Sequence, residues 1–341
     1  MPLPTGPVLC VDDEPANLAL LRETLKDEYP LVFATSGVEG LRAVEKHRPS
    51  LILLDVQLPD IDGYSVCRRL KADQRTAEIP VIFVTVLSSE FDEQAGFDAG
   101  GVDYIPKPAV PAIVRARVRT HLSLVRASRL EESYRDAIYM LAVAGHYNDP
   151  GTGVHIWRMA AYSGVLAEAL GWTAERCRLI ELAASMHDTG KIGIPSAILS
   201  KQGPLDADEW AIMKTHSEIG HEILCRSQGA VFQLAAEIAL YHHERWDGRG
   251  YPRGLAGEAI PEAARIVAIA DVFDALSMDR PYKQRWPVER IVNALREGAG
   301  SHFDPDLIRV FLGSMDRILE IKQRWDRDGD GSVFGWLAAR G

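Results

Sequence analysis

Seven imidazole and carboxylate side chains in the C-terminal two-thirds of the sequence are of the types that bind transition-metal ions. They are His155, His187, Asp188, His216, His242, His243 and Asp271. Mixed nitrogen and oxygen ligands suit Fe, Mn, Co, Ni or Zn better than Ca²⁺ or Mg²⁺. Because Asp188 has two oxygens and lies beside the imidazole of His187, it can bridge two ions. A pair of divalent ions is a common arrangement for hydrolysing a phosphodiester.

Each of these residues also has an ordinary structural explanation when it is taken alone. An adjacent histidine and aspartate can be a polar helix end, and His216 fits the surface of an amphipathic helix. The tandem His242-His243 is harder to explain in this way, because it ends an apolar helical run and adjacent helical residues diverge by about 100 degrees. Asp271 follows a run of apolar residues, where burying a carboxylate is costly without a metal ion or a donor.

A second set of polar side chains lies in residues 1–122, where each one ends or follows an expected strand. Asp12 and Asp13 follow the first strand, Asp55 ends the third, Thr85 follows the fourth, and Lys107 follows the fifth. The carboxyl ends of parallel strands meet at one edge of a sheet, so these side chains should converge. Three converging carboxylates repel one another unless a hard cation joins them, and Mg²⁺ prefers such oxygen ligands. The lysine and the threonine could bind an added phosphoryl group.

The elements that position this second set predict an α/β doubly wound domain over residues 1–122. Short apolar runs at 8–11, 31–34, 51–54, 81–84 and 103–105 are expected to be strands, and helical patterns at 15–29, 38–47 and 64–71 lie between them. Apolar strands without alternation are typical of a parallel sheet buried on both faces. We therefore expect a five-stranded parallel sheet covered by helices.

Residues 123–145 are expected to form a helical linker. The helical pattern begins near Ala112 and continues without a Gly or Pro to about Gly145, with apolar residues at close to heptad spacing. One interpretation is the last helix of the first domain fused to a linker helix. The other is a parallel homodimer seam that transmits the state of the first domain.

The metal-ligand candidates lie in residues 146–325, which predict an all-α domain. After a helical pattern at 137–144, at the end of the linker, further patterns span 155–170, 174–186, 206–225, 230–243, 263–277, 287–298 and 306–323. A site in such a domain must be made from side chains on facing helices. Residues 326–341 are expected to be a solvated tail, because the calcium-loop-like start at Asp326 has Leu337 where the last acidic ligand would be needed.

With these motifs in place, residues 7–120 resemble the receiver domain of bacterial two-component response regulators. The resemblance implies that a sensor histidine kinase phosphorylates Asp55 and that Asp12 and Asp13 hold Mg²⁺ together with Asp55. It also implies that Thr85 and Lys107 bind the acyl phosphate and that Tyr104 is the aromatic residue that reorients on activation. The added charge could bias the face formed by the last strands and helices.

Residues 135–325 resemble the HD-GYP family of HD-domain metal phosphohydrolases. The matching residues are His155, His187-Asp188 with Gly190-Lys191, His216, His242-His243-Glu244, Gly250-Tyr251-Pro252 and Asp271. Members hydrolyse cyclic di-GMP to linear pGpG or on to GMP. The resemblance implies a metal site made of all seven ligands, bridged by Asp188. Its further implications are that Asp188 and Lys191 are catalytic, that Lys191, Arg280 and Lys283 hold substrate phosphates, and that Gly250-Tyr251-Pro252 shapes the rim or a partner surface.

One departure from the family pattern limits this expectation. Some members place a glutamate four residues before the first histidine, where it binds a third metal ion, but this chain has Gly151 there. We therefore expect two divalent transition-metal ions and leave open whether cyclic di-GMP or pGpG is the better substrate. The alternatives are an adaptor that senses nucleotide or binds a partner without turnover, and a phosphohydrolase that acts on mononucleotides.

Composition excludes several other classes of protein. The chain has 341 residues and a formal net charge of −10, which argues against binding duplex nucleic acid. Its four cysteines form no CxxC pair, so they indicate free thiols in a reducing cytoplasm. No signal-peptide pattern or membrane-spanning run is present in the sequence. We expect a cytoplasmic protein with no membrane insertion.

Overall fold

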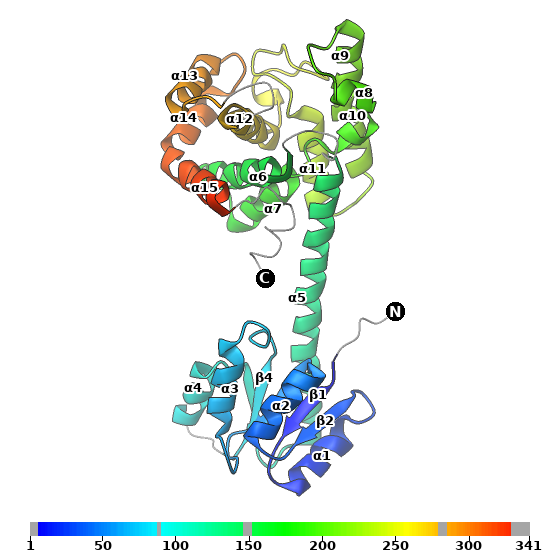
Figure 1. Ribbon diagram of the computed structural model, residues 1–341, viewed down its shortest axis with the longest axis vertical. Coiled ribbons are helices and arrows are strands. Elements are labelled where there is room, and N and C mark those ends of the chain that lie inside the picture. Colours follow the sequence, from blue (N-terminus) through cyan, green and yellow to red (C-terminus); the bar gives the residue numbers. More distant parts are fainter. Residues whose placement is uncertain (1–5, 87–89, 146–151, 279–284, 329–341) are drawn as a thin grey trace. The chain divides into compact units, whose positions relative to one another are not determined.

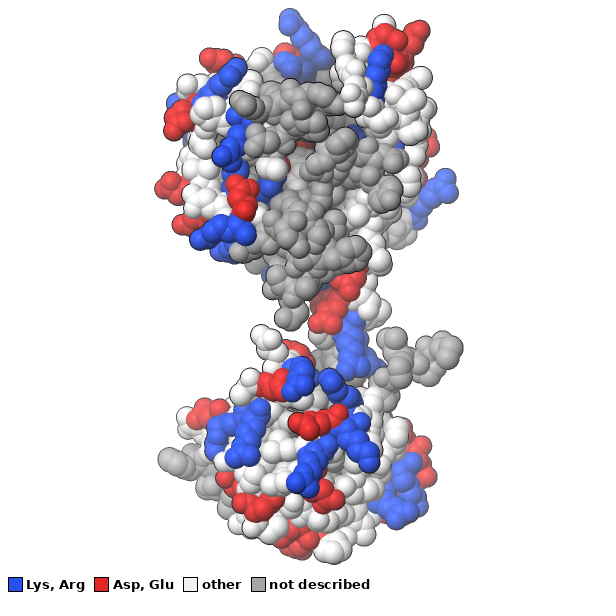
Figure 2. Space-filling model, in the orientation of Figure 1, with Lys and Arg blue, Asp and Glu red and all other residues white. Residues whose placement is uncertain are grey.

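The computed structural model describes residues 6–86, 90–145, 152–278 and 285–328. The chain divides into two compact units, Met1–Glu132 and Ser133–Gly341, which Figure 1 shows as an α/β unit and a helical unit. Lys and Arg side chains lie among Asp and Glu on the face of each unit drawn in Figure 2. None of the helices within the described residues is both long and apolar enough to cross a membrane.

The first unit is built on a five-stranded parallel sheet, as predicted. Its strands are β1 (Val8–Val11), β2 (Leu31–Ala34), β3 (Leu51–Asp55), β4 (Val81–Thr85) and β5 (Asp103–Pro106), in the order β2-β1-β3-β4-β5. Val8 and Cys10 pack into one apolar cluster, while Leu9 and Val11 pack into another. Successive side chains of a strand point to opposite faces, so β1 is buried on both sides. This burial explains why the strand runs are apolar without alternation.

Helices follow the strands of this unit and cover the sheet (Figure 1). They are α1 (Pro15–Leu25), α2 (Gly37–His47), α3 (Gly63–Ala72), α4 (Glu90–Asp98) and α5 (Pro111–Gly145). The side chains of Ser36 and Asp62 accept hydrogen bonds from backbone N–H groups in the first turns of α2 and α3, which fixes where these helices begin. The first helix ends at Leu25, four residues earlier than the pattern over 15–29 predicts.

The long helix α5 belongs to both units. Val114, Val118 and Leu122 are buried in the core of the first unit. Ile138 and Ala142 are buried in the core of the second. The division between the units falls at Glu132, inside the predicted linker 123–145. The pattern over 137–144 is therefore the end of α5 and not a separate helix.

The described part of the second unit contains helices and no strand, which confirms the predicted all-α domain. After α5 come α6 (Thr152–Ala169), α7 (Ala174–Ala184), η1 (Thr189–Gly193), α8 (Ser196–Leu199), α9 (Ala207–Lys214), α10 (His216–Leu224), α11 (Ala230–Tyr241), η2 (Gly257–Ala259), α12 (Glu262–Ser277), α13 (Val288–Gly298), α14 (Pro305–Gly313) and α15 (Met315–Asp328). Buried side chains of α6, α7, α11 and α12 meet in one apolar core.

Two of the predicted helices are divided in the structure. The pattern over 206–225 forms α9 and α10, which are separated at Thr215, and the pattern over 306–323 forms α14 and α15, which are separated at Ser314. Hydrophobic periodicity continues across both breaks, so it does not reveal them. Because α15 continues to Asp328, residues 326–328 of the predicted tail are helical. Leu337 and the rest of the tail lie outside the described residues.

Candidate metal centre and phosphoacceptor site

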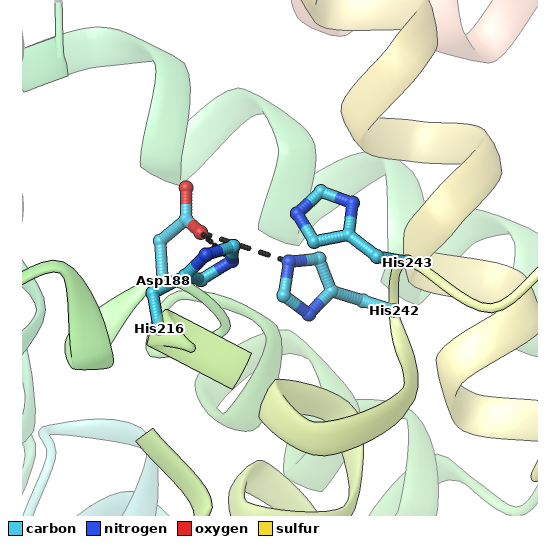
Figure 3. Close-up of side chains that lie close together, drawn as sticks. All are labelled: Asp188, His216, His242 and His243. Carbon is cyan, nitrogen blue, oxygen red and sulfur yellow. Dashed lines mark ion pairs between the residues drawn. The ribbon is translucent and has the colours of Figure 1, made fainter. Parts of the chain in front are cut away.

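The predicted metal ligands of the helical unit form two groups. One contains Asp188, His216, His242 and His243, and the other contains His155, His187 and Asp271; within each group the ligand atoms lie within 4.8 Å of one another. Figure 3 shows the first group converging from three segments: the turn after α7, the start of α10 and the end of α11. Elements far apart in the sequence thus place all seven side chains at two adjacent positions.

Asp188 connects the two groups. Its Oδ1 lies 3.3 Å from Nε2 of His216 and 3.6 Å from Nε2 of His242 (Figure 3). Its Oδ2 lies 3.2 Å from Nε2 of His187, in the other group, and 2.7 Å from Nζ of Lys191. The two carboxylate oxygens therefore face different groups, as a bridging ligand requires. Lys191 lies beside this carboxylate in η1.

Backbone carbonyls orient three of the imidazoles. Nδ1 of His187 lies 3.0 Å from the carbonyl of Ala184, and Nδ1 of His216 lies 2.7 Å from that of Met213. Nδ1 of His242 lies 3.0 Å from the carbonyl oxygen of the residue three positions earlier. An acceptor facing Nδ1 keeps the proton on that atom and leaves the lone pair of Nε2 directed at the centre. This is the usual arrangement around a metal-binding histidine.

The buried polar atoms of the centre fit a metal ion. Nε2 of His216 and Nε2 of His242 are both inaccessible to solvent and have no hydrogen-bond partner within the described residues. A buried polar atom without a partner is costly, and such atoms are rare in folded proteins. Divalent ions bound between these nitrogens and Asp188 would satisfy them, so the residues present fit the ions that the sequence implies.

Gly190 explains how the turn after α7 can lie so close to α10. A Cβ at position 190 would lie 1.9 Å from the carbonyl oxygen of His216 and 2.4 Å from the backbone nitrogen of Gly220. Only a residue without a side chain allows this approach, which places Asp188 beside His216. The glycine of the His-Asp-x-Gly-Lys motif is therefore a packing requirement of the metal centre.

The segment with Gly250-Tyr251-Pro252 lies against the group that contains His243. A Cβ at Gly250 would lie 2.4–2.6 Å from backbone atoms of residues 243–245, so the loop can fold back onto the histidines only with glycine there. The Glu244 carboxylate accepts hydrogen bonds from the backbone nitrogens of Arg253 at 2.7 Å and Leu255 at 3.0 Å. The ring of Tyr251 stacks on His243 with centroids 4.8 Å apart. The motif thus forms one wall of the centre.

The sequence analysis did not identify two residues that contact or support a candidate ligand, Arg158 and Asp274. Nδ1 of His155 lies 2.7 Å from a carboxylate oxygen of Asp274, which also accepts two hydrogen bonds from the guanidinium of Arg158. The signal that could have revealed them is spacing. Arg158 is three residues after His155, and Asp274 is three residues after Asp271, so each lies on the same helical face as a ligand.

The two ligand groups differ in their protonation. Burial lowers the pKa of His216 to about 4, and burial beside two other imidazoles lowers that of His243 well below its ordinary value. Burial also opposes charge on His155, but hydrogen bonds with Asp271 and Asp274 outweigh it and raise its pKa to about 10. The pKa of Asp271 is correspondingly lowered, against the effect of burial, by His155 and His187. In the metal-free protein, the group with His155 therefore holds a proton that an ion must replace.

The predicted phosphoacceptor site is assembled at the strand ends of the first unit. Asp12, Asp13 and Asp55 offer oxygens within 4.8 Å of one another. Nζ of Lys107 lies 2.6 Å from Asp55 and 2.9 Å from Asp12. Burial raises the pKa of Asp55, although Lys107 opposes that shift. Thr85 is buried at the end of β4, and its carbonyl oxygen accepts a hydrogen bond from the backbone nitrogen of Lys107.

Tyr104 lies in β5 near this site. The guanidinium of Arg117 lies 5.6 Å from the centroid of its ring. Three other residues of the sequence prediction, Gly151, Arg280 and Lys283, lie outside the described residues.

Known proteins show the same two-part organisation. A family model described as a response regulator receiver domain matches residues 8–119, and one described as an HD domain matches residues 127–307. The cyclic di-GMP phosphodiesterase response regulator RpfG of Xanthomonas campestris pv. campestris (strain 8004) is 39% identical over 336 residues, which cover 92% of this chain and 89% of the relative.

Two relatives come from Vibrio cholerae serotype O1. A probable cyclic di-GMP phosphodiesterase is 36% identical over 351 residues, covering 93% of this chain and 80% of that protein. A 3'3'-cGAMP-specific phosphodiesterase 2 is 45% identical over 193 residues, covering 57% of this chain and 37% of that protein. HD-domain phosphohydrolases depend on metal ions, and the histidine and aspartate groups fit such a site. The chain therefore belongs to the response regulators in which a receiver domain is joined to an HD-type phosphodiesterase domain.

Proposed function

We propose that this protein hydrolyses cyclic di-GMP in its helical unit and that phosphorylation of Asp55 controls this activity. The observation that carries the proposal is the position of Asp188, whose two oxygens face two separate groups of ligands. One bridging carboxylate between two divalent ions suits in-line attack on a phosphodiester. The names of the two relatives aligned over most of the chain support cyclic di-GMP as the substrate.

The side chains of the centre have distinct roles in this proposal. His155, His187 and Asp271 would hold one transition-metal ion, and His216, His242 and His243 would hold the other, with Asp188 shared. Bound divalent ions supply Lewis-acid activation of water and of the phosphate. Lys191, 2.7 Å from Asp188, brings a cation that can pair with a phosphate oxygen of the substrate. Arg280 and Lys283 are proposed, from the sequence alone, to hold further phosphate oxygens.

Gly151 bears on the number of ions that the centre binds. Gly151 offers no ligand where some family members have a glutamate, and the described residues contain two histidine-rich groups and no third. We therefore propose a two-metal centre made from Fe, Mn, Co, Ni or Zn. The product is pGpG or GMP, and pGpG itself is a candidate substrate.

A turnover assay on the full chain tests the proposal. Protein purified without added metal is analysed for metal content and then given cyclic di-GMP, pGpG or 3'3'-cGAMP in separate reactions. We expect linear product from cyclic di-GMP. Full metal occupancy with nucleotide binding but no linear product would instead support an adaptor that senses nucleotide. Faster turnover of 3'3'-cGAMP would place the chain with the relative that is specific for that dinucleotide.

The first unit is proposed to be the regulatory part. Asp12, Asp13 and Asp55 hold Mg²⁺, and a sensor histidine kinase supplies the phosphoryl group that Thr85 and Lys107 bind. Support comes from the convergence of these groups and from a pocket of about 580 Å³ that is lined by Asp13, Asp55 and Lys107. Turnover before and after treatment with acetyl phosphate and Mg²⁺ measures the direction of control.

We also propose that the chain forms a homodimer through α5. Leu124 is 59% exposed and Leu130 is 67% exposed on this helix. Leucines at this level of exposure gain from being covered, and a second copy of the helix would cover them. Light scattering of the wild-type chain and of a Leu124→Lys, Leu130→Lys variant tests this. Equal masses for the two proteins would contradict a seam at these residues.

A further inference from the structure

We propose that Asp274 and Arg158 are positioning residues that set the metal affinity of the group with His155, independently of the group with His216. This inference rests on the two-metal centre of the proposed function. It adds the residues that make the metal affinities of the two ligand groups differ. Neither residue belongs to the two groups of candidate ligands, so both would act through the imidazole of His155.

Asp274 is fully buried and uses both of its oxygens. One oxygen lies 2.7 Å from Nδ1 of His155 and 2.9 Å from Nη2 of Arg158, and the other accepts a hydrogen bond from Nε of Arg158 at 2.7 Å. Arg158 is itself only 1% exposed. The fork of the guanidinium fixes the plane of the carboxylate, and the carboxylate fixes the ring of His155.

Helix packing repeats this contact one turn along α6 and α12. Nε2 of His155 lies 3.3 Å from Asp271, and the guanidinium of Arg158 meets Asp274 one turn further on. A spacing of three residues places each pair on the same face of its helix. The positions of His155 and Asp271 are therefore coupled to the pairing of Arg158 with Asp274, and movement of either helix changes both contacts.

The support given to His155 differs from the support given to the other group. His216 and His242 direct Nδ1 at neutral backbone carbonyls, whereas His155 directs it at a carboxylate. A carboxylate partner makes an imidazole a stronger donor to a metal ion, and losing such a partner costs about 10–100-fold in metal affinity. Asp274 thus acts on one ion and not on both.

Stability alone does not account for a buried Arg158–Asp274 pair. Taking both charges out of water costs several kcal/mol, and replacing such pairs by apolar residues is often neutral or stabilising. Arg158 holds the Asp274 carboxylate where it accepts the Nδ1 proton of His155 in a hydrogen bond. Orientation of the ligand is the role that this geometry serves.

Asp274→Asn tests the inference. The amide oxygen is the better partner for Arg158, so the amide NH₂ would face Nδ1 of His155 and move the ring proton to Nε2, the ligand atom. Metal-free full-length protein is titrated with Zn²⁺ and followed by native mass spectrometry and calorimetry. We expect the affinity for one of the two zinc ions to fall about 10–100-fold, while the affinity for the other stays within about twofold of wild type.

Two further variants guard against a general effect of destabilisation. Asp304→Asn weakens another buried carboxylate–guanidinium contact, with Arg265, and neither residue belongs to a ligand group. We expect it to lower the unfolding temperature but to keep both zinc affinities. Arg158→Lys keeps the positive charge but loses the paired hydrogen bonds of the guanidinium to Asp274. We expect the affinity for the same zinc ion to fall, but by less than in Asp274→Asn. If Asp274→Asn does not fold, the zinc affinities of Arg158→Lys test the inference in its place.

Two results would overturn the inference. One is unchanged affinity for both ions in the folded variant, and the other is equal weakening of both, which would indicate a general structural role. Because zinc binding is measured without nucleotide, the result does not depend on the substrate. A wild-type protein that binds two zinc ions but does not hydrolyse cyclic di-GMP would refute the proposed function and leave this test readable.

Discussion

Each unit pairs a lysine with a carboxylate in its site, but the two units build their sites by different rules. In the first unit, three carboxylates stand at adjacent strand ends, and Lys107 reaches Asp12 and Asp55. In the second, the ligands come from helices and turns far apart in the sequence and are mostly imidazoles, and Lys191 lies 2.7 Å from Asp188. An oxygen-only site suits an exchangeable hard cation, whereas the imidazole-rich centre suits a resident transition-metal ion.

Each site combines buried and more accessible members. Asp13 is exposed and lines an open pocket, whereas Asp12 and Asp55 are only 1% and 4% exposed. His187, His216 and His242 are at most 3% exposed. A buried centre excludes bulk water and strengthens the electrostatic interactions within it. The clearer difference between the sites is therefore the chemistry of their ligands, which are carboxylates in one and mostly imidazoles in the other.

The largest expected effect comes from removing the bridge. Asp188→Asn replaces an anion that faces both ligand groups with a neutral amide, which has a single oxygen for two ions. We expect loss of bound metal and a fall in turnover of at least about 1,000-fold, or ~4 kcal/mol. Metal analysis and product chromatography measure it, and acetyl-phosphate labelling of Asp55 is the control that should not change. Wild-type turnover in this variant would refute the bridging role.

Asp55→Asn changes the carboxylate site of the first unit and tests whether the metal centre is independent of it. The amide cannot form the acyl phosphate, so acetyl phosphate should add no mass to the chain and should no longer change its turnover. Transition-metal content should match the wild type, because the ligands of the helical unit contain no residue of the first unit. A loss of those ions in this variant would contradict the separation of roles.

Protons should distinguish the two halves of the metal centre. In the metal-free protein, the pKa of His155 is raised to about 10, so an ion displaces one proton at every pH below that value. Zinc affinity at its group should therefore fall about tenfold when the pH drops from 7.5 to 6.5. In the other group, burial lowers the pKa of His216 to about 4. That imidazole is therefore neutral at both pH values and carries no proton that an ion must displace. Calorimetry at both pH values, with proton release measured in two buffers, checks this.

The same shift makes a prediction for the metal-free protein. A pKa raised above the value of the unfolded chain stabilises the folded state below about pH 6.5, the ordinary histidine pKa. This contribution is lost as the pH rises towards 10. Metal-free protein should therefore lose unfolding free energy between pH 6.5 and 9.5, and protein loaded with zinc should lose less. A flat profile for the metal-free chain would contradict the proton shared by His155 and Asp271.

The sequence was sufficient for the carboxylate site because one rule places all its members. The carboxyl ends of parallel strands meet at one edge, so assigning β1, β3, β4 and β5 was enough to bring Asp12, Asp55 and Lys107 together. The helical unit has no comparable rule. Its ligands were recognised by type and by resemblance to a family, and their division into two groups depends on how the helices cross.

What the sequence could not provide is the support around the ligands. Asp274 lies in an apolar helix, and nothing local shows that it faces His155 and Arg158, which are more than a hundred positions away. The breaks at Thr215 and Ser314 were missed because each side of the break continues the same apolar pattern. Gly190 was noted as part of a motif, but its reason, the close approach of α10, required the coordinates.

The smallest expected effect concerns an aromatic ring that each unit places under a cation. Lys214 lies 5.5 Å from the ring centroid of Tyr251, much as Arg117 lies 5.6 Å from that of Tyr104. The contacts of Tyr251 with His243 and Lys214 are made by the ring, so Tyr251→Phe should change turnover less than about threefold. Tyr251→Ala removes the stack, worth about 0.5–1.5 kcal/mol, and should lower turnover about 2–10-fold. A larger loss in Tyr251→Phe than in Tyr251→Ala would show that the hydroxyl, and not the ring, acts on the substrate.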